Sequence, residues 1–192
     1  MSTTIHPRNS HRVEWRTVML IAATTLFWAG TVYLIGRHGW WPLVALAVLC
    51  VTLHSSCQHE ALHGHPTRNR LVNEALVFIT PGVFFPYRRF KATHLQHHHD
   101  EWLTDPYEDP ETNFMTPADW QRLNPLMRAI LKFNNTLAGR LTIGPALGVT
   151  RFYIADAKAI LAGDRRIAFA WLLHAVGLAI TFGVMGVINM AH

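Results

Sequence analysis

Long apolar segments dominate the hydrophobic pattern of this chain, and polar residues gather between them. Residues 17–36 are twenty consecutive positions without a charge, bordered by Arg16 and Arg37. Twenty helical residues rise about 30 Å, which is enough to cross the hydrocarbon core of a bilayer. Similar segments at 42–62 and 168–190 predict a second and a third span. The pattern therefore predicts an all-α integral membrane protein with about three transmembrane helices, organised as a single domain over residues 1–192.

A fourth apolar segment, 71–87, is a poor candidate for a span because Glu74, Pro81 and Pro86 interrupt it. We expect a helix or re-entrant loop that lies in the membrane interface and packs on protein. The basic residues that follow are predicted to anchor the chain at the lipid headgroups. They are Arg88, Arg89 and Lys91.

The segments 117–139 and 148–162 mix apolar and basic residues, as in helices that lie along a membrane surface. Thr116 followed by Pro117 is typical of a helix start, because threonine caps the helix and proline suits its first position. Gly163 is a typical helix end. Residues 100–111 are acidic and rich in turn-forming residues, which predicts a solvated connection or a docking surface for a basic electron donor.

The distribution of basic residues predicts the sidedness of the chain. Three of the seventeen lysines and arginines precede the first span, Arg37 lies in the turn after it, and thirteen lie between Arg68 and Arg166. Basic residues favour the cytosolic side, so we expect the N-terminus and the polar region after the second span to be cytosolic. His192 is then expected outside. This topology accounts for the net charge of +5 without a nucleic-acid partner.

Two cysteines lie seven residues apart on the second predicted span, Cys50 and Cys57. Seven helical residues place their Cα atoms about 10 Å apart, which is too far for a disulfide. We therefore predict that both are packing residues. His54 lies between them, and its spacing from His59 and His63 turns it away from the face that those two residues share.

Histidines are concentrated in one part of the chain, with seven of the thirteen between residues 59 and 99. On a helix, positions i, i+3 and i+4 share a face, so two clusters of imidazoles are predicted. The first is His59 with His63, and the second is His94 with His97 and His98. Imidazole is a ligand of iron, zinc, copper and nickel, whereas magnesium and calcium take oxygen ligands.

The two clusters have the form His-Glu-Ala-Leu-His at 59–63 and His-Leu-Gln-His-His at 94–98. They resemble the first and second histidine boxes of the membrane fatty acid desaturase and hydroxylase superfamily. The resemblance implies a centre of two iron ions on the cytosolic side. It also implies a fatty acyl lipid substrate, O2, and a separate ferredoxin-like or cytochrome electron donor. The metal ligands implied by the two boxes are His59, His63, His94, His97 and His98.

Glu60 and Asp100 are candidates to orient ligand imidazoles by accepting their second N–H. The resemblance implies three histidine boxes, and the third is missing from this sequence, because only His174 and His192 follow His99. We therefore expect an N-terminal portion of a family member, which holds iron incompletely and is inactive by itself. The remaining histidines near the boxes or inside a span are weaker ligand candidates. They are His65, His99 and His174.

Two alternatives to a fatty acyl desaturase remain open at the level of sequence. A lipid or carotenoid hydroxylase of the same superfamily begins with the same hydrogen abstraction. The segment 59–63 also satisfies the pattern HExxH, in which two histidines bind zinc and the glutamate acts as general base. A membrane zinc protease would therefore use Glu60 and would leave the second cluster unexplained.

Overall fold

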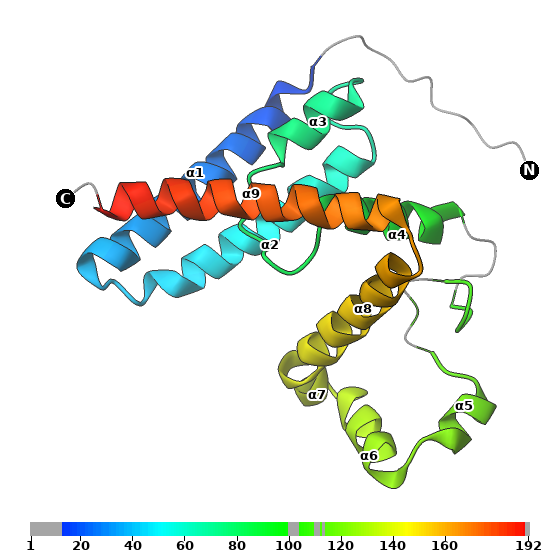
Figure 1. Ribbon diagram of the computed structural model, residues 1–192. Coiled ribbons are helices and arrows are strands. Elements are labelled where there is room, and N and C mark those ends of the chain that lie inside the picture. The colour runs from blue at the N-terminus through cyan, green and yellow to red at the C-terminus, as the bar shows by residue number, and fades with distance from the viewer. Residues whose placement is uncertain (1–12, 100–103, 110–111, 113, 191–192) are drawn as a thin grey trace, which may run out of the picture. The chain divides into compact units, whose positions relative to one another are not determined.

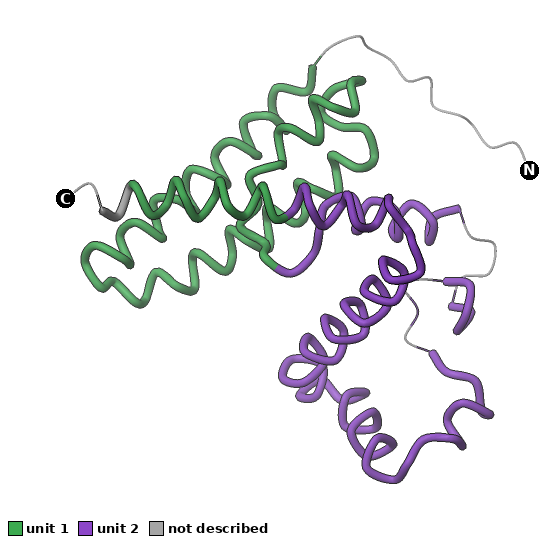
Figure 2. Tube along the Cα trace, viewed as in Figure 1, with its two compact units in different colours: residues 1–83, 175–192 green, residues 84–174 purple. Residues whose placement is uncertain are grey.

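The computed structural model describes residues 13–99, 104–109, 112 and 114–190, and all regular structure within them is helical (Figure 1). This agrees with the all-α prediction. The helices divide into two compact units (Figure 2). The first unit comprises residues 1–83 and 175–192, and the second comprises residues 84–174. The terminal positions and the segments 100–103, 110–111 and 113 lie outside the described residues. Asp100 and His192 are among them, so the predictions made for these two residues fall outside the described structure.

The first unit is built on a helical hairpin of α1 (Trp15–His38) and α2 (Leu43–Leu62), which pack against each other. The turn begins at Gly39, whose φ of 65° lies in the left-handed region that favours glycine. Its N–H donates to the carbonyl of Ile35 over 2.9 Å and so satisfies one carbonyl at the end of α1.

Most of the buried side chains of this hairpin are small or polar. They recur every three or four residues, the spacing at which two helices interlock. Close approach of helix backbones through small residues is a feature of membrane helix pairs. The buried stripe of α2 includes Cys50, His54, Cys57 and Ala61, and that of α1 includes Ile21, Thr24 and Thr31. Both cysteines are buried free thiols, which confirms their predicted packing role.

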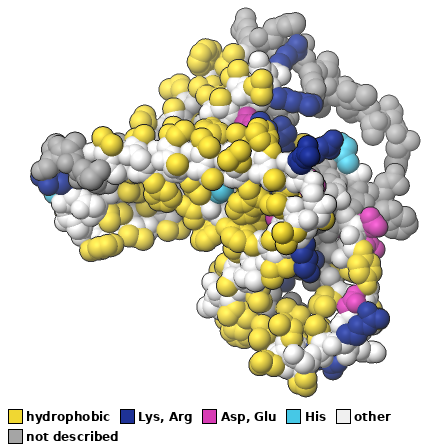
Figure 3. Space-filling view, in the orientation of Figure 1, with side chains coloured by type: hydrophobic (Ala, Val, Ile, Leu, Met, Phe, Trp, Pro, Cys, Tyr) yellow, Lys and Arg dark blue, Asp and Glu magenta, His cyan; other side chains and the backbone are white. Residues whose placement is uncertain are grey.

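Among the residues that the structure describes, two helices are long and apolar enough to cross a membrane: α1 over Trp15–His38, and α9 (Arg165–Met190) over Arg165–Val187. In Figure 3 hydrophobic side chains cover much of the visible face of α9. Leu172, Phe182 and Val187 on this helix are 59%, 61% and 64% exposed, as expected of side chains that face lipid. These apolar helices suggest a membrane protein. The second predicted span coincides with the continuous helix α2. The C-terminal half of α2 is polar, so the role of this helix as a span stays a prediction.

The segment 71–87 contains a short helix followed by irregular chain, in agreement with the expectation that it is no continuous span. Helix α3 (Arg70–Leu76) begins at Asn69, whose side chain accepts from the N–H groups of Leu71 and Val72. Buried Asn73 fastens the preceding loop, because its amide nitrogen donates to the Thr67 carbonyl over 2.8 Å and its amide oxygen accepts from the Thr67 N–H over 2.9 Å.

The second unit begins with α4 (Tyr87–His99), the helix that carries the second histidine box. It continues through α5 (Pro117–Arg122), α6 (Pro125–Asn134), α7 (Leu137–Thr142) and α8 (Gly144–Leu161), and includes the start of α9.

The prediction of one helix over 117–139 is wrong, because two further caps divide that segment. The side chain of Asn124 accepts from the Met127 N–H, and that of Thr136 accepts from the Gly139 N–H, so each starts a new helix. The start at Thr116 and Pro117 is confirmed.

A buried ion pair holds α4 to the rest of the second unit. The Arg89 guanidinium contacts both carboxylate oxygens of Asp156 on α8, at 2.8 to 3.0 Å. The indole N–H of Trp171 on α9 donates to the same carboxylate over 2.8 Å. Asp156 is 2% exposed and the Arg89 side chain 19%. The prediction that Arg89 anchors the chain at lipid headgroups is therefore wrong, and its charge is used inside the protein.

Arg88 also differs from the headgroup anchor that the sequence predicted. Its guanidinium lies 5.2 Å from the centre of the Phe169 ring on α9, a cation–π contact within the second unit. Lys91 remains an anchor by prediction only.

Candidate metal centre

The first pair of candidate ligands lies at the C-terminal end of α2. Its buried stripe of Cys50 and Ala61 faces α1, and about 100° of rotation per residue places His59 and His63 roughly opposite that stripe. Their rings contact edge to face with centroids 4.6 Å apart. The packing of the hairpin therefore fixes the direction in which the first box points.

The second pair lies on α4, and the packing of this helix also sets the direction in which the pair points. Arg89 holds one face of α4 against α8, and the rotation per residue places His94 and His98 on the opposite face. Their Nε2 atoms are 2.9 Å apart. Two ligands at right angles on one ion, with metal–nitrogen bonds of about 2.1 Å as at zinc sites, have nitrogens about 3 Å apart. The pair is thus spaced as two ligands of one metal ion.

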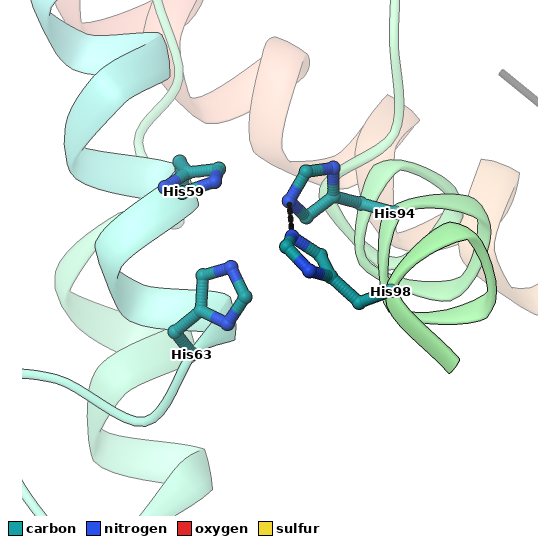
Figure 4. Close-up of side chains that lie close together, drawn as sticks. All are labelled: His59, His63, His94 and His98. Carbon is teal, nitrogen blue, oxygen red and sulfur yellow. Dashed lines mark hydrogen bonds between the residues drawn. The ribbon is translucent and has the colours of Figure 1, made fainter. Parts of the chain in front are cut away.

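All four of these histidines are brought together in the structure. One ring nitrogen from each of them lies within 4.8 Å of the others, and Figure 4 shows the four side chains. Three are half-buried and His98 is exposed. Four imidazoles within this distance, with part of their surface open, suit a metal that must also leave positions for other ligands. The donor set therefore fits iron.

His97, the fifth predicted ligand, lies outside this group of four. Its Nδ1 atom is 2.9 Å from the carboxylate of Asp109, and its ring centroid is 6.4 Å from that of His94. The sequence analysis missed Asp109 as a functional candidate, because it is one of several acidic residues in a turn-rich loop. Glu60, the candidate partner of the first box, lies 3.6 Å from Nδ1 of His59.

The weaker ligand candidates are directed elsewhere. His65 Nδ1 is 2.7 Å from the Glu14 carboxylate, and His99 donates to the carbonyl of Leu95 on its own helix. His174 is buried on α9 beside Trp171, with ring centroids 5.9 Å apart. His54, 1% exposed, lies in the buried stripe of α2, on the side of the helix that its spacing predicts.

Comparison with known proteins adds the family. A family model described as fatty acid desaturase matches residues 37–192. The chain belongs to the fatty acid desaturase family. No curated protein and no solved structure matches the chain. Members of this family are di-iron oxidoreductases in general, and the group of four histidines could hold a metal ion.

Membership in the fatty acid desaturase family also bears on the two helices that hold the histidines. Both α2 and α4 lie within the matched residues 37–192. When iron is bound, His59 and His63 would hold it from α2, and His94 and His98 from α4. Glu60 is 54% exposed, and its carboxylate lies 3.6 Å from Nδ1 of His59, which is beyond hydrogen-bond distance.

Proposed function

We propose that this protein is an O2-dependent membrane di-iron oxidoreductase of lipid metabolism that desaturates fatty acyl chains. The observation that carries the proposal is the group of four histidine nitrogens within 4.8 Å, in a chain that belongs to the desaturase family. The two iron ions would supply the O2 chemistry that removes hydrogen from an acyl methylene. The electrons come from a separate ferredoxin-like or cytochrome donor.

The roles of the protein's own residues follow from their positions. The four clustered histidines bind metal as neutral imidazoles, which requires each to present an unprotonated nitrogen. The exposed apolar side chains of α1 and α9 hold the protein in the bilayer, where acyl substrates are located. Short amphipathic helices such as α6 lie along the membrane surface, so that the histidine boxes meet the acyl chain at the cytosolic face.

The proposal is tested by lipid analysis of cells that express the protein together with an electron donor. When the chain is extended by a fourth span and a third histidine box, we expect new double bonds in the fatty acyl pool, dependent on O2. The chain alone is expected to hold iron incompletely and to form little product. His59→Ala and His94→Ala should each lower both iron content and product, because each removes a ligand. His65→Ala is the matched control, since His65 is paired with Glu14 and should leave both unchanged.

Other products would change the conclusion in defined ways. A hydroxylated lipid or carotenoid would assign the hydroxylase reaction, and unchanged lipids from an iron-loaded protein would refute a lipid oxidoreductase. A zinc protease would depend on Glu60 and not on His94. Cleavage of membrane peptides that is lost in Glu60→Ala and retained in His94→Ala would therefore overturn the desaturase proposal.

A further inference from the structure

Asp109 is a buried acid next to the second histidine box. Its side chain is 2% exposed, and one carboxylate oxygen lies 2.9 Å from Nδ1 of His97. The other oxygen accepts from the backbone N–H of Thr104 over 3.0 Å. A buried carboxylate is stable only when donors compensate its charge. His97 therefore supplies an N–H at Nδ1, which leaves Nε2 as the unprotonated nitrogen of the neutral ring.

The described residues of this loop, 104–109 and 112, are arranged around this carboxylate. The backbone of Thr104 adopts a φ of 73°, an uncommon conformation for a β-branched residue, while its N–H donates to Asp109. The Thr112 hydroxyl donates to the Thr104 carbonyl over 3.1 Å, and the Thr112 N–H donates to the Asp109 carbonyl over 3.2 Å. Asp105 accepts from the N–H groups of Tyr107 and Glu108. The loop thus holds the carboxylate at a fixed position.

From this geometry we infer that Asp109 is a positioning residue, which fixes His97 in the tautomer that directs Nε2 to the iron centre. The inference deepens the proposed function, because it depends on iron binding at the histidine boxes. A carboxylate that accepts the second N–H of a ligand imidazole fixes the tautomer and ring orientation and raises the basicity of the ligand. Asp109 thereby lets His97 join the ligands on α4 when iron binds.

The tautomer of His97 can be measured in the metal-free protein, independently of catalysis. Long-range proton–nitrogen correlation spectra of protein labelled with ¹⁵N-histidine distinguish protonated from unprotonated ring nitrogens. His97→Gln assigns the resonance, and a pH above the titration range of histidine keeps the ring neutral. We expect the Nδ1–H form for the unaltered protein. In Asp109→Asn we expect a mixture of tautomers, because an amide both donates and accepts.

A matched control separates this role from the charge of the loop. Glu108→Gln removes the same charge one residue away, from an exposed side chain. Competition with a chelator should show iron affinity reduced about 10- to 100-fold in Asp109→Asn. Glu108→Gln should retain the affinity and the His97 tautomer of the unaltered protein, and Asp109→Glu should restore part of both.

Each result of these measurements decides the inference. An Nε2–H tautomer in the unaltered protein overturns it, and so does an unchanged tautomer or unchanged iron affinity in Asp109→Asn. Equal losses in Asp109→Asn and Glu108→Gln would assign the effect to loop charge and overturn it as well. If the unaltered protein binds no iron while His97 shows the expected tautomer, the proposed function fails. This result is distinct from the results above, in which the positioning of His97 by Asp109 fails.

Discussion

Replacing Arg89 with methionine tests whether the buried ion pair holds α4 in the second unit. Methionine keeps much of the length of the arginine side chain but removes the guanidinium nitrogens that contact Asp156. The carboxylate of Asp156, which is 2% exposed, would then still accept a hydrogen bond from the Trp171 indole N–H. Removal of one partner from a buried pair costs about 3–5 kcal/mol, because a buried charge loses its compensation.

That free energy corresponds to a measurable shift in thermal stability. A protein of 150–250 residues loses about 2–4 °C of Tm per kcal/mol, so Arg89→Met should lower Tm by about 6–20 °C. The measurement is thermal unfolding in detergent micelles, followed by circular dichroism. Iron affinity should fall together with Tm, because His94 and His98 lie on the face of α4 opposite Arg89.

An exposed ion pair in the same unit supplies the control. Arg122 lies 3.6 Å from Asp119 and is 81% exposed. Arg122→Met makes the same chemical change, and its cost should stay below about 1 kcal/mol. The double variant Arg89→Met with Asp156→Leu removes both buried charges and should be more stable than Arg89→Met alone. Equal Tm values for Arg89→Met and Arg122→Met, or no recovery in the double variant, would refute the reasoning.

Three further predictions concern other parts of the chain. The hydroxyl of Tyr107, and then that of Thr116, donate to Asp119 and lower the pKa of its carboxyl below the ordinary value of 3.8. A lowered folded-state pKa gives stability that is present above about pH 3.8 and is lost as the pH falls through the folded-state pKa. Tyr107→Phe should therefore flatten the dependence of Tm on acidic pH. An unchanged slope would contradict this. A fluorescent label at Leu126→Cys on α6, where Leu126 is 70% exposed, should be quenched by brominated acyl chains. A label at Lys132→Cys, about 120° away around the same helix, should be quenched much less. Reporter fusions at residues 39 and 120 should report opposite sides of the membrane, and a common side would exclude α2 as a span.

The pattern of apolar and polar positions was enough to predict the helical class, the extents of α1, α2 and α9, and the histidine boxes. These features depend on local spacing, since a helix repeats every 3.6 residues and a histidine at i and i+4 must share a face. The helix start at Thr116 and the separation of Cys50 from Cys57 were predictable for the same reason.

Side-chain partners distant in sequence could not be predicted in this way. Asp156 follows Arg89 by sixty-seven residues, and only the packing of α8 and α9 against α4 shows that this arginine compensates a buried charge and does not face the headgroups. Asp109 resembles the other acids of its loop until folding buries it beside His97. The sequence by itself determined which residue types carry the chemistry and on which helical face they lie. The tertiary structure decided which of them meet, because burial and long-range pairing depend on how helices pack and not on their periodicity.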